Sequence, residues 1–322
     1  MNLQFLSKKL IYVIITVIVV IIFNYVLFRL MPGDPMTMLS RNPKISADAL
    51  ESIRRLFGLD LPWYEQFFVY VKNLLHGELG MSFTFKAPVT SVIASRIVPT
   101  VVLLISCEIF AVLIGLTLGT IAAWKRGKKA DLAIMGGSLM LYAMPTFWFS
   151  MMMVVIFAVK LRLFPISGML TPGMSYATTG LMLSDFGRHL FLPCAVLTLN
   201  YIAEYAIMMR STLTDILSED YILTAKAKGF PDRYVLRYHA LPNALLPVTT
   251  LVMMNLGFVV AGTIEVETIF SWPGLGRLMF EAVTARDYPL LQGTFLITTI
   301  CVVVANFLAD ITYVYLDPRV KY

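Results

Sequence analysis

The sequence from Val101 to Trp124 reads VVLLISCEIFAVLIGLTLGTIAAW, and Glu108 is its only charged residue. A helix needs about 20 predominantly apolar residues to cross about 30 Å of hydrocarbon, because it rises about 1.5 Å per residue. The apolar residues run continuously and do not alternate with period two, as they would in a strand of a transmembrane barrel. The stretch therefore predicts a membrane-spanning helix.

Five further stretches have the same character, namely Leu10–Phe28, Leu132–Val159, Leu190–Met209, Leu245–Ile264 and Leu290–Leu316. The 322 residues are 58% hydrophobic and 14% charged, whereas soluble domains are about 45–50% apolar and about 25% charged. A cleaved secretory signal is the alternative for the first stretch. Its apolar core is too long for a signal, and no small-residue cleavage site follows it. The sequence predicts an all-α membrane protein with six transmembrane helices.

Positive charge indicates how these helices are oriented. Lys and Arg are abundant near both ends of the chain and in the connections around residues 125–129 and 210–237. Short basic connections stay in the cytoplasm, whereas long external segments cross the membrane largely regardless of charge. We therefore expect both termini to be cytoplasmic. The net charge of +6 then reflects topology, and it gives no reason to expect a nucleic-acid partner.

Two connections are long enough to carry structure of their own. In the external segment 31–98, Asp48 and Glu51 resemble a capping box, and a second amphipathic helix is expected from Pro62 to Gly77. Such helices either pack on the outer ends of the spans or lie in the membrane interface.

The cytoplasmic segment 211–243 predicts a pair of short helices, because Gly229 stops a helix over Asp220–Lys228 and Pro231 can begin another that runs to Leu241. Two interpretations are open for this helix pair. It could dock into a groove of a peripheral protein. Alternatively, its cations Lys226, Lys228, Arg233 and Arg237 could rest on anionic lipid.

The runs DYILTAKAKG (220–229) and HALPNALLP (239–247) resemble the cytoplasmic loop that defines permease subunits of binding-protein-dependent ABC importers. The family pattern is Glu-Ala-Ala, a Gly four residues after the second Ala, and a later Leu-Pro. Ala225, Gly229, Leu241 and Pro242 match this pattern. Leu223 and Thr224 replace the Glu and the first Ala, a departure that is usual in the dipeptide, oligopeptide and nickel branch.

Further stretches resemble the first permease subunit of that branch, in order along the chain: MPGDP (31–35), FGLDLP (57–62), GELGMS (77–82), ETIFSWPGLG (267–276), RDYP (286–289) and LDPR (316–319). The resemblance implies a type I ABC importer permease architecture. Its parts would be an N-terminal transmembrane helix (1–30), an external loop (31–98), a five-helix core (99–316) that includes the coupling loop 211–243, and a cytoplasmic tail (317–322).

The same resemblance implies that the chain moves short peptides across the cytoplasmic membrane of a prokaryote by alternating access. The implied partners are a second homologous permease subunit, two ATPase subunits, an extracytoplasmic substrate-binding protein and membrane lipids. Nickel, glutathione and oligosaccharides are alternative cargoes, and a stand-alone secondary transporter is a rival class. The sequence has no Gly-x-x-x-x-Gly-Lys-Ser/Thr phosphate loop. We therefore expect the chain itself to be no enzyme and to hold no cofactor or metal, with ATP and Mg²⁺ bound by the ATPase subunits.

Two groups of candidate site residues follow. The resemblance assigns ATPase coupling to Tyr221, Ala225, Lys226, Ala227, Lys228, Gly229, Leu241 and Pro242. Charged groups at membrane depth usually face a cavity or a partner. The candidates for the translocation path or gate are Glu108, Glu204, Glu265, Glu267, Trp272 and Asp310. The alternatives for these residues are hydrogen bonds between spans, anchoring at the interface, or plain solvation.

Overall fold

The computed structural model describes residues 3–30, 61–258 and 262–316. In this part of the chain the structure is helical, and the one pairing of extended backbone is an isolated bridge between Met81 and Pro88. The helices are α1 (Leu3–Leu30), α4 (Trp63–Leu75), α5 (Val89–Trp124), α6 (Lys129–Ala143), α7 (Thr146–Met153), the π-helix η1 (Val154–Lys160), α8 (Thr179–Ile216), α9 (Asp220–Ala227), α10 (Asp232–Val235), the π-helix η2 (Leu236–Ala240), α11 (Leu241–Phe258), α12 (Ile264–Ile269), α13 (Leu275–Thr284) and α14 (Tyr288–Leu316).

The long helices account for up to five of the six predicted spans. Four of them, in α1, α5, α8 and α14, are long and apolar enough to cross a membrane, and α6 with the following α7–η1 makes a fifth if the bent pair counts as one span. The sixth predicted span, Leu245–Ile264, begins inside α11, and residues 259–261 within it lie outside the described part. The all-α membrane fold is thus confirmed.

The predicted span Leu132–Val159 is not one continuous helix. The chain breaks between α6 and α7 by 99°, far more than a kink. Met144 and Pro145 are both extended, with ψ of 127° and 126°. Proline lacks the N–H that would continue a helix, and it disfavours helical backbone in the residue before it. Pro145 therefore ends one helix and caps the next.

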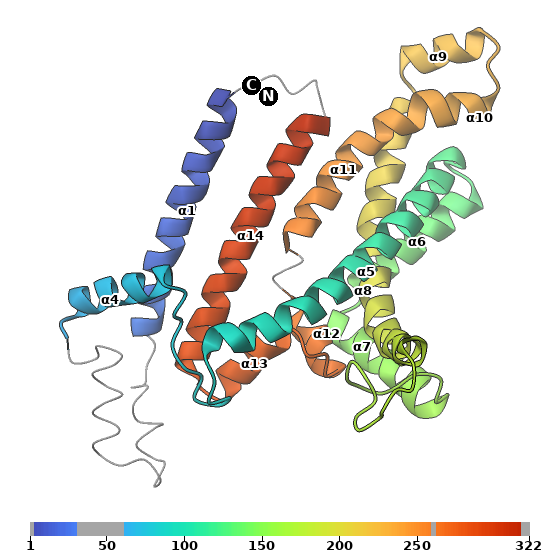
Figure 1. The fold of residues 1–322 in the computed structure, drawn as a ribbon. Helices are drawn as coiled ribbons and strands as arrows, with labels where there is room; N and C mark the ends of the chain where they lie inside the picture. Colours follow the sequence, from blue (N-terminus) through green and yellow to red (C-terminus); the bar gives the residue numbers. More distant parts are fainter. Residues whose placement is uncertain (1–2, 31–60, 259–261, 317–322) are drawn as a thin grey trace.

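The helix ends are sorted to two sides of the molecule. Helices α1 and α14 run side by side, and the start of α1, the end of α14 and the α9–α10 pair all lie at one end, whereas α4, α12 and α13 lie at the other (Figure 1). This arrangement is what the predicted orientation requires. The first end is called the inner end below, and the second the outer end.

Two glycines allow α5 and α8 to pack closely. A Cβ on Gly115 would lie 2.5 Å from the Cβ of Tyr205, and a Cβ on Gly119 would lie 2.6 Å from the carbonyl oxygen of Ala206. Real Cβ atoms do not approach other atoms so closely, so both positions need a residue without one. Small residues at such crossings let membrane helices gain van der Waals contact.

The external helix α4 corresponds to the second amphipathic helix predicted in segment 31–98. It packs on the outer end of α1, where the Tyr25 hydroxyl donates to the carbonyl oxygen of Trp63 at 2.6 Å and the rings of Tyr25 and Phe67 meet edge to face. Of the two interpretations left open for this helix, the structure therefore favours packing. The other expected helix, around Asp48 and Gly58, lies outside the described residues.

Candidate functional site

The inner end carries a helix pair joined at Gly229. Helix α9 ends at Ala227, and Gly229 has a φ of +84° with no other atom within 4 Å of where its Cβ would be. Glycine adopts this left-handed backbone without the steric cost that other residues meet. The sequence analysis predicted that Gly229 stops the first helix, and within this chain the positive φ is the reason for glycine.

The second helix of the pair differs from the prediction. It was expected to be a separate element from Pro231 to Leu241 inside a loop that ends at residue 243. Instead α10, η2 and α11 follow one another without a break, and Leu236 and Leu241 at the junctions both have helical backbone. Pro242 lacks the N–H that a helix interior uses, yet the backbone stays helical across it, so the second helix is the start of a membrane helix. Likewise α8 extends to Ile216, well into the expected loop.

The face of the α9–α10 pair that meets the helix bundle is held there by apolar contacts. Ile222 is fully buried, and Ala225 and Val235 are nearly so, in a cluster that includes Met209 and Leu213 of α8. The residue that matches the family pattern at Ala225 is thus a buried packing position. The other predicted coupling residues are exposed, except Leu241, which is half-buried.

The exposed face of the α9–α10 pair, which points away from the bundle, is aromatic. Phe230 and Tyr234 stack with ring centroids 4.9 Å apart, and Tyr234 and Tyr238 lie 4.7 Å apart. His239 lies 5.8 Å from Tyr234 and completes the set, which we call the aromatic cluster. Phe230, Tyr234 and Tyr238 are 40–57% exposed. Phe230 was missed from the sequence, although its spacing of four residues from Tyr234 was visible.

Two of the four cations on this pair are already engaged. Lys226 forms an ion pair with Asp232 at 3.4 Å, and the Arg237 guanidinium lies 5.7 Å from the centroid of the Tyr238 ring. The exposed face therefore offers more aromatic surface than free positive charge. Aromatic surface of this kind fits a protein groove, and Lys228 and Arg233, which are exposed as well, are the cations left for anionic lipid.

A polar network joins α5, α8 and α11 at membrane depth. The Tyr205 hydroxyl donates to Glu108, and the Asn255 amide donates to the Tyr205 oxygen at 2.9 Å and to Glu204 at 3.3 Å. Glu108 is 4% exposed and Tyr205 is fully buried, whereas Glu204 is half-buried. The two acids were identified from the sequence. Tyr205 and Asn255 were not, because nothing in the sequence places them beside those acids.

The third acid at membrane depth has a different place. Asp310 on α14 accepts a hydrogen bond from Lys9 of α1 at 2.6 Å, and the two side chains are 49% and 35% exposed. This pair anchors the inner ends of two neighbouring spans. It corresponds to the interface-anchoring alternative for Asp310.

At the outer end, Glu267 and Trp272 fasten the α12–α13 segment to α5. The Glu267 carboxylate accepts hydrogen bonds from the Thr100 hydroxyl at 2.9 Å and the Arg277 amide at 3.0 Å, and the Trp272 indole donates to the carbonyl oxygen of Pro99 at 2.9 Å. Glu267 is fully buried, and its burial raises the pKa of its carboxyl. Glycines make room for it, since a Cβ on Gly274 would lie 2.4 Å from the carboxylate.

Glu265, the remaining gate candidate, is exposed on α12. Solvation was the alternative weighed for it and for Glu267. The exposed position of Glu265 favours that alternative, whereas the buried carboxylate of Glu267 argues against it.

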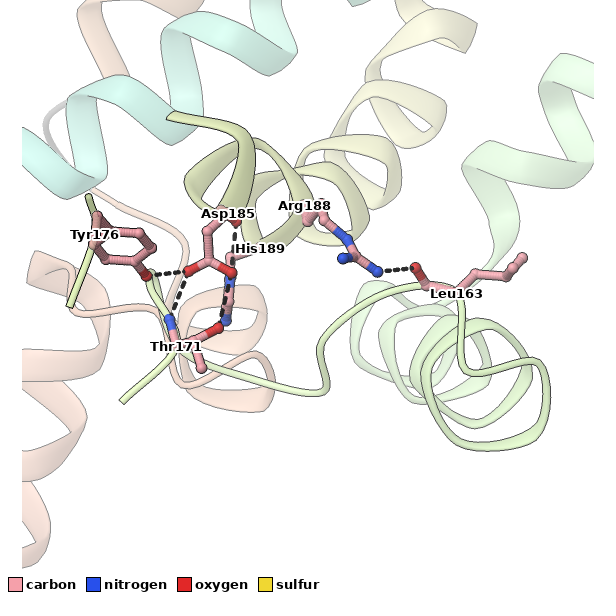
Figure 2. A network of polar contacts seen from close by, with 6 residues as sticks. All are labelled: Leu163, Thr171, Tyr176, Asp185, Arg188 and His189. Atoms are coloured by element: carbon pink, nitrogen blue, oxygen red, sulfur yellow. Dashed lines mark hydrogen bonds and ion pairs between the residues drawn. The ribbon is translucent and has the colours of Figure 1, made fainter. Parts of the chain in front are cut away.

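A second network orders the loop between η1 and α8. Asp185 of α8 accepts hydrogen bonds from the backbone amide and hydroxyl of Thr171, at 2.7 and 2.8 Å, and from the Tyr176 hydroxyl at 2.5 Å (Figure 2). Arg188 donates to the carbonyl oxygen of Leu163 on the other arm of the loop. The bond to Asp185 raises the pKa of Tyr176. No pattern in the sequence indicated this network.

These features define a class of protein. The family described as the inner membrane component of binding-protein-dependent transport systems matches residues 115–322, and the N-terminal part of such membrane components matches residues 2–105. The chain belongs to this family. It is therefore a type I permease subunit in the inner membrane of a prokaryote.

Individual relatives are similar over almost their whole length. The chain is 35% identical to the dipeptide transport system permease protein DppB of Escherichia coli strain K12 and 37% identical to the di/tripeptide transport system permease protein DppB of Pseudomonas aeruginosa, with 99% of each chain covered. It is 33% identical to the glutathione transport system permease protein GsiC of E. coli K12, with the same coverage. The permease fold also matches an inward-facing structure of the MetNI methionine ABC transporter with a TM-score of 0.57 and 16% identity, covering 70% of this chain and 96% of that chain.

Proposed function

We propose that this chain is the permease subunit of an importer for short peptides, which moves di- or oligopeptides through the inner membrane by alternating access. The observation that carries the proposal is full-length similarity to permeases of dipeptide and di/tripeptide systems. The membrane-depth network supports it, because ionisable residues inside a membrane usually mark a transport pathway.

Energy would come from two ATPase subunits seated on the α9–α10 pair. The aromatic cluster is an exposed apolar face of the kind that fills a groove in a partner, and Gly229 sets the angle between the two helices. ATP and Mg²⁺ would bind to those subunits. A second permease subunit would complete the pathway, and an external binding protein would deliver the cargo.

Reconstitution tests this proposal. The chain is expressed with a second permease, the ATPases and the binding protein, and uptake of labelled dipeptide into vesicles is measured together with ATP hydrolysis. We expect the assembled complex to hydrolyse ATP faster with loaded binding protein, and the purified chain alone to hydrolyse none. Hydrolysis by the isolated chain would refute its role as a subunit.

Glutathione is a second candidate cargo, because a glutathione permease is nearly as similar to the chain. Competition of unlabelled glutathione, nickel and an oligosaccharide against dipeptide uptake separates the cargoes. If glutathione is taken up and dipeptides are not, the transporter class stands and the peptide assignment falls.

A further inference from the structure

The three acids at membrane depth have different surroundings, and only one of them remains able to meet a passing solute. Glu108 is 4% exposed beneath Tyr205, and Asp310 is occupied by Lys9. Glu204 is half-buried, and its described hydrogen bond is the long one from Asn255 at 3.3 Å. The structure thus singles out Glu204 from the group.

Because of where Glu204 lies on α8, exposing its carboxylate to lipid would cost free energy. Arg210, which pairs with an aspartate of α6 at 2.9 Å, lies six residues nearer the inner end of α8, or about 9 Å along the helix. Ile207 and Met254, close to Glu204 and Asn255 in the sequence, are 36% and 54% exposed. A carboxylate this deep among apolar side chains faces water or a partner rather than hydrocarbon.

We propose that Glu204 and Asn255 form the point at which this chain contacts the positively charged ammonium group of its peptide cargo during passage. The proposal rests on the peptide-importer function. A short peptide carries an N-terminal ammonium group, which is largely protonated near neutral pH. The Glu204 carboxylate supplies the opposite charge, and Asn255 holds it from the neighbouring helix.

The buried half of the network explains why this contact has a fixed position. Asn255 also donates to Tyr205 at 2.9 Å, and Tyr205 in turn donates to Glu108, so the amide is held from α5 and α8 together. Asn255 donates both of these hydrogen bonds from its Nδ2, and no described residue donates to its Oδ1. The pair can therefore offer two acceptors to one ammonium group.

The first test neutralises the carboxylate without changing its shape. In the complete complex, Glu204→Gln should lower the maximal rate of peptide uptake about tenfold or more, since hydrogen bonds to charged groups contribute about 1.5–3 kcal/mol. The KM for loaded binding protein should stay unchanged, because docking occurs at the outer end. ATP hydrolysis stimulated by the binding protein should fall less than uptake, so that fewer peptides move per ATP.

Two further variants separate this role from a structural one. Glu204→Asp keeps the charge and should restore most of the uptake. Asp215→Asn removes the same charge from an exposed position on the same helix, and it should leave uptake unchanged. If Glu204→Gln lowers uptake and ATP hydrolysis equally, or detaches the second permease during purification, the residue holds the assembly together and the proposal is wrong.

A photocrosslinker locates the cargo directly. Benzoylphenylalanine at Ile207, one turn from Glu204, should label a radioactive dipeptide during turnover, whereas the same group at Ile15 on α1 should not. Labelling of the second permease alone at Ile207 would overturn the proposal. Failure of the wild-type complex to take up any peptide would refute the proposed function instead, so the two failures are distinguishable.

Discussion

Replacement of Gly229 tests whether the α9–α10 pair couples this chain to the proposed ATPase subunits. The φ of +84° lies in the left-handed region, where a residue with a Cβ pays about 1–2 kcal/mol. No atom lies within 4 Å of the missing Cβ, so steric collision inside this chain adds nothing to that cost. Backbone strain at the joint is therefore the whole expected effect of Gly229→Ala within the chain, and a β-branched Val adds to it.

This strain should appear as weaker binding of the ATPases. If the ATPase groove accepts the pair only at its present angle, a penalty of about 1–2 kcal/mol lowers affinity about 5- to 30-fold. The effect should increase in the order Asn, Ala, Val, because Asn tolerates left-handed backbone best. Copurification of the ATPases and peptide uptake per ATP measure it. The spans should still insert, since Gly229 lies outside them.

The matched control is Gly127, in the turn between α5 and α6. It has a φ of +76° and equally open space, so Gly127→Val introduces similar strain at another inner-end turn. We expect it to leave ATPase binding unchanged. Equal behaviour of the two variants would refute the coupling role of Gly229. A larger loss on neutralising Lys226, Lys228 and Arg233 together would support anchoring to lipid instead.

Four other predictions concern the scaffold. Gly119→Ala should destabilise the complex by about 1–3 kcal/mol in thermal melting, because it overpacks the α5–α8 crossing, whereas Gly136→Ala, where a Cβ meets nothing within 4 Å, should not. Arg210 donates two hydrogen bonds to the carboxylate of Asp131 on α6, which lysine cannot do. Arg210→Lys should lower the free energy of unfolding by about 1 kcal/mol or less and make the melting midpoint depend on salt. Burial raises the pKa of Glu267 above its ordinary value of 4.5. The protonated side chain therefore contributes stability at pH values below 4.5, and this contribution is lost as the pH rises through the raised pKa of the folded state. Melting of Glu267→Gln should accordingly depend less on pH than wild type over that window. A cysteine at Lys128 should react with an impermeant thiol reagent only from the cytoplasm, and labelling from outside would refute the topology.

Much of this architecture could be predicted from sequence because lipid imposes simple rules on single helices. Apolar length located the spans, and Gly229 marked the joint of the helix pair. The break at Pro145 shows where such rules stop. A proline inside an apolar run indicates a bend, but its angle of 99° depends on how α7 packs against α8 and α12.

The candidate site was predictable in part, because a charged residue within an apolar run is conspicuous in a sequence. Glu108 and Glu204 stand out as charges in apolar runs. Their roles depend on Tyr205 and Asn255, which reach them from neighbouring positions that only the packed bundle defines. The Asp185 network was invisible for the same reason, because its partners are side chains and backbone groups of an irregular loop.

The unbroken run of α10, η2 and α11 has a mechanical consequence. From Asp232 to Phe258 it forms a rod about 40 Å long, with one end beside the aromatic cluster and the other beyond Asn255. A rod of that length acts as a lever, so a tilt of about 10° at the cytoplasmic end would displace the far end by about 7 Å. Such a displacement exceeds the reach of a hydrogen bond. Modest motion of an ATPase could therefore break the contact between Asn255 and Glu204, releasing whatever that pair was holding.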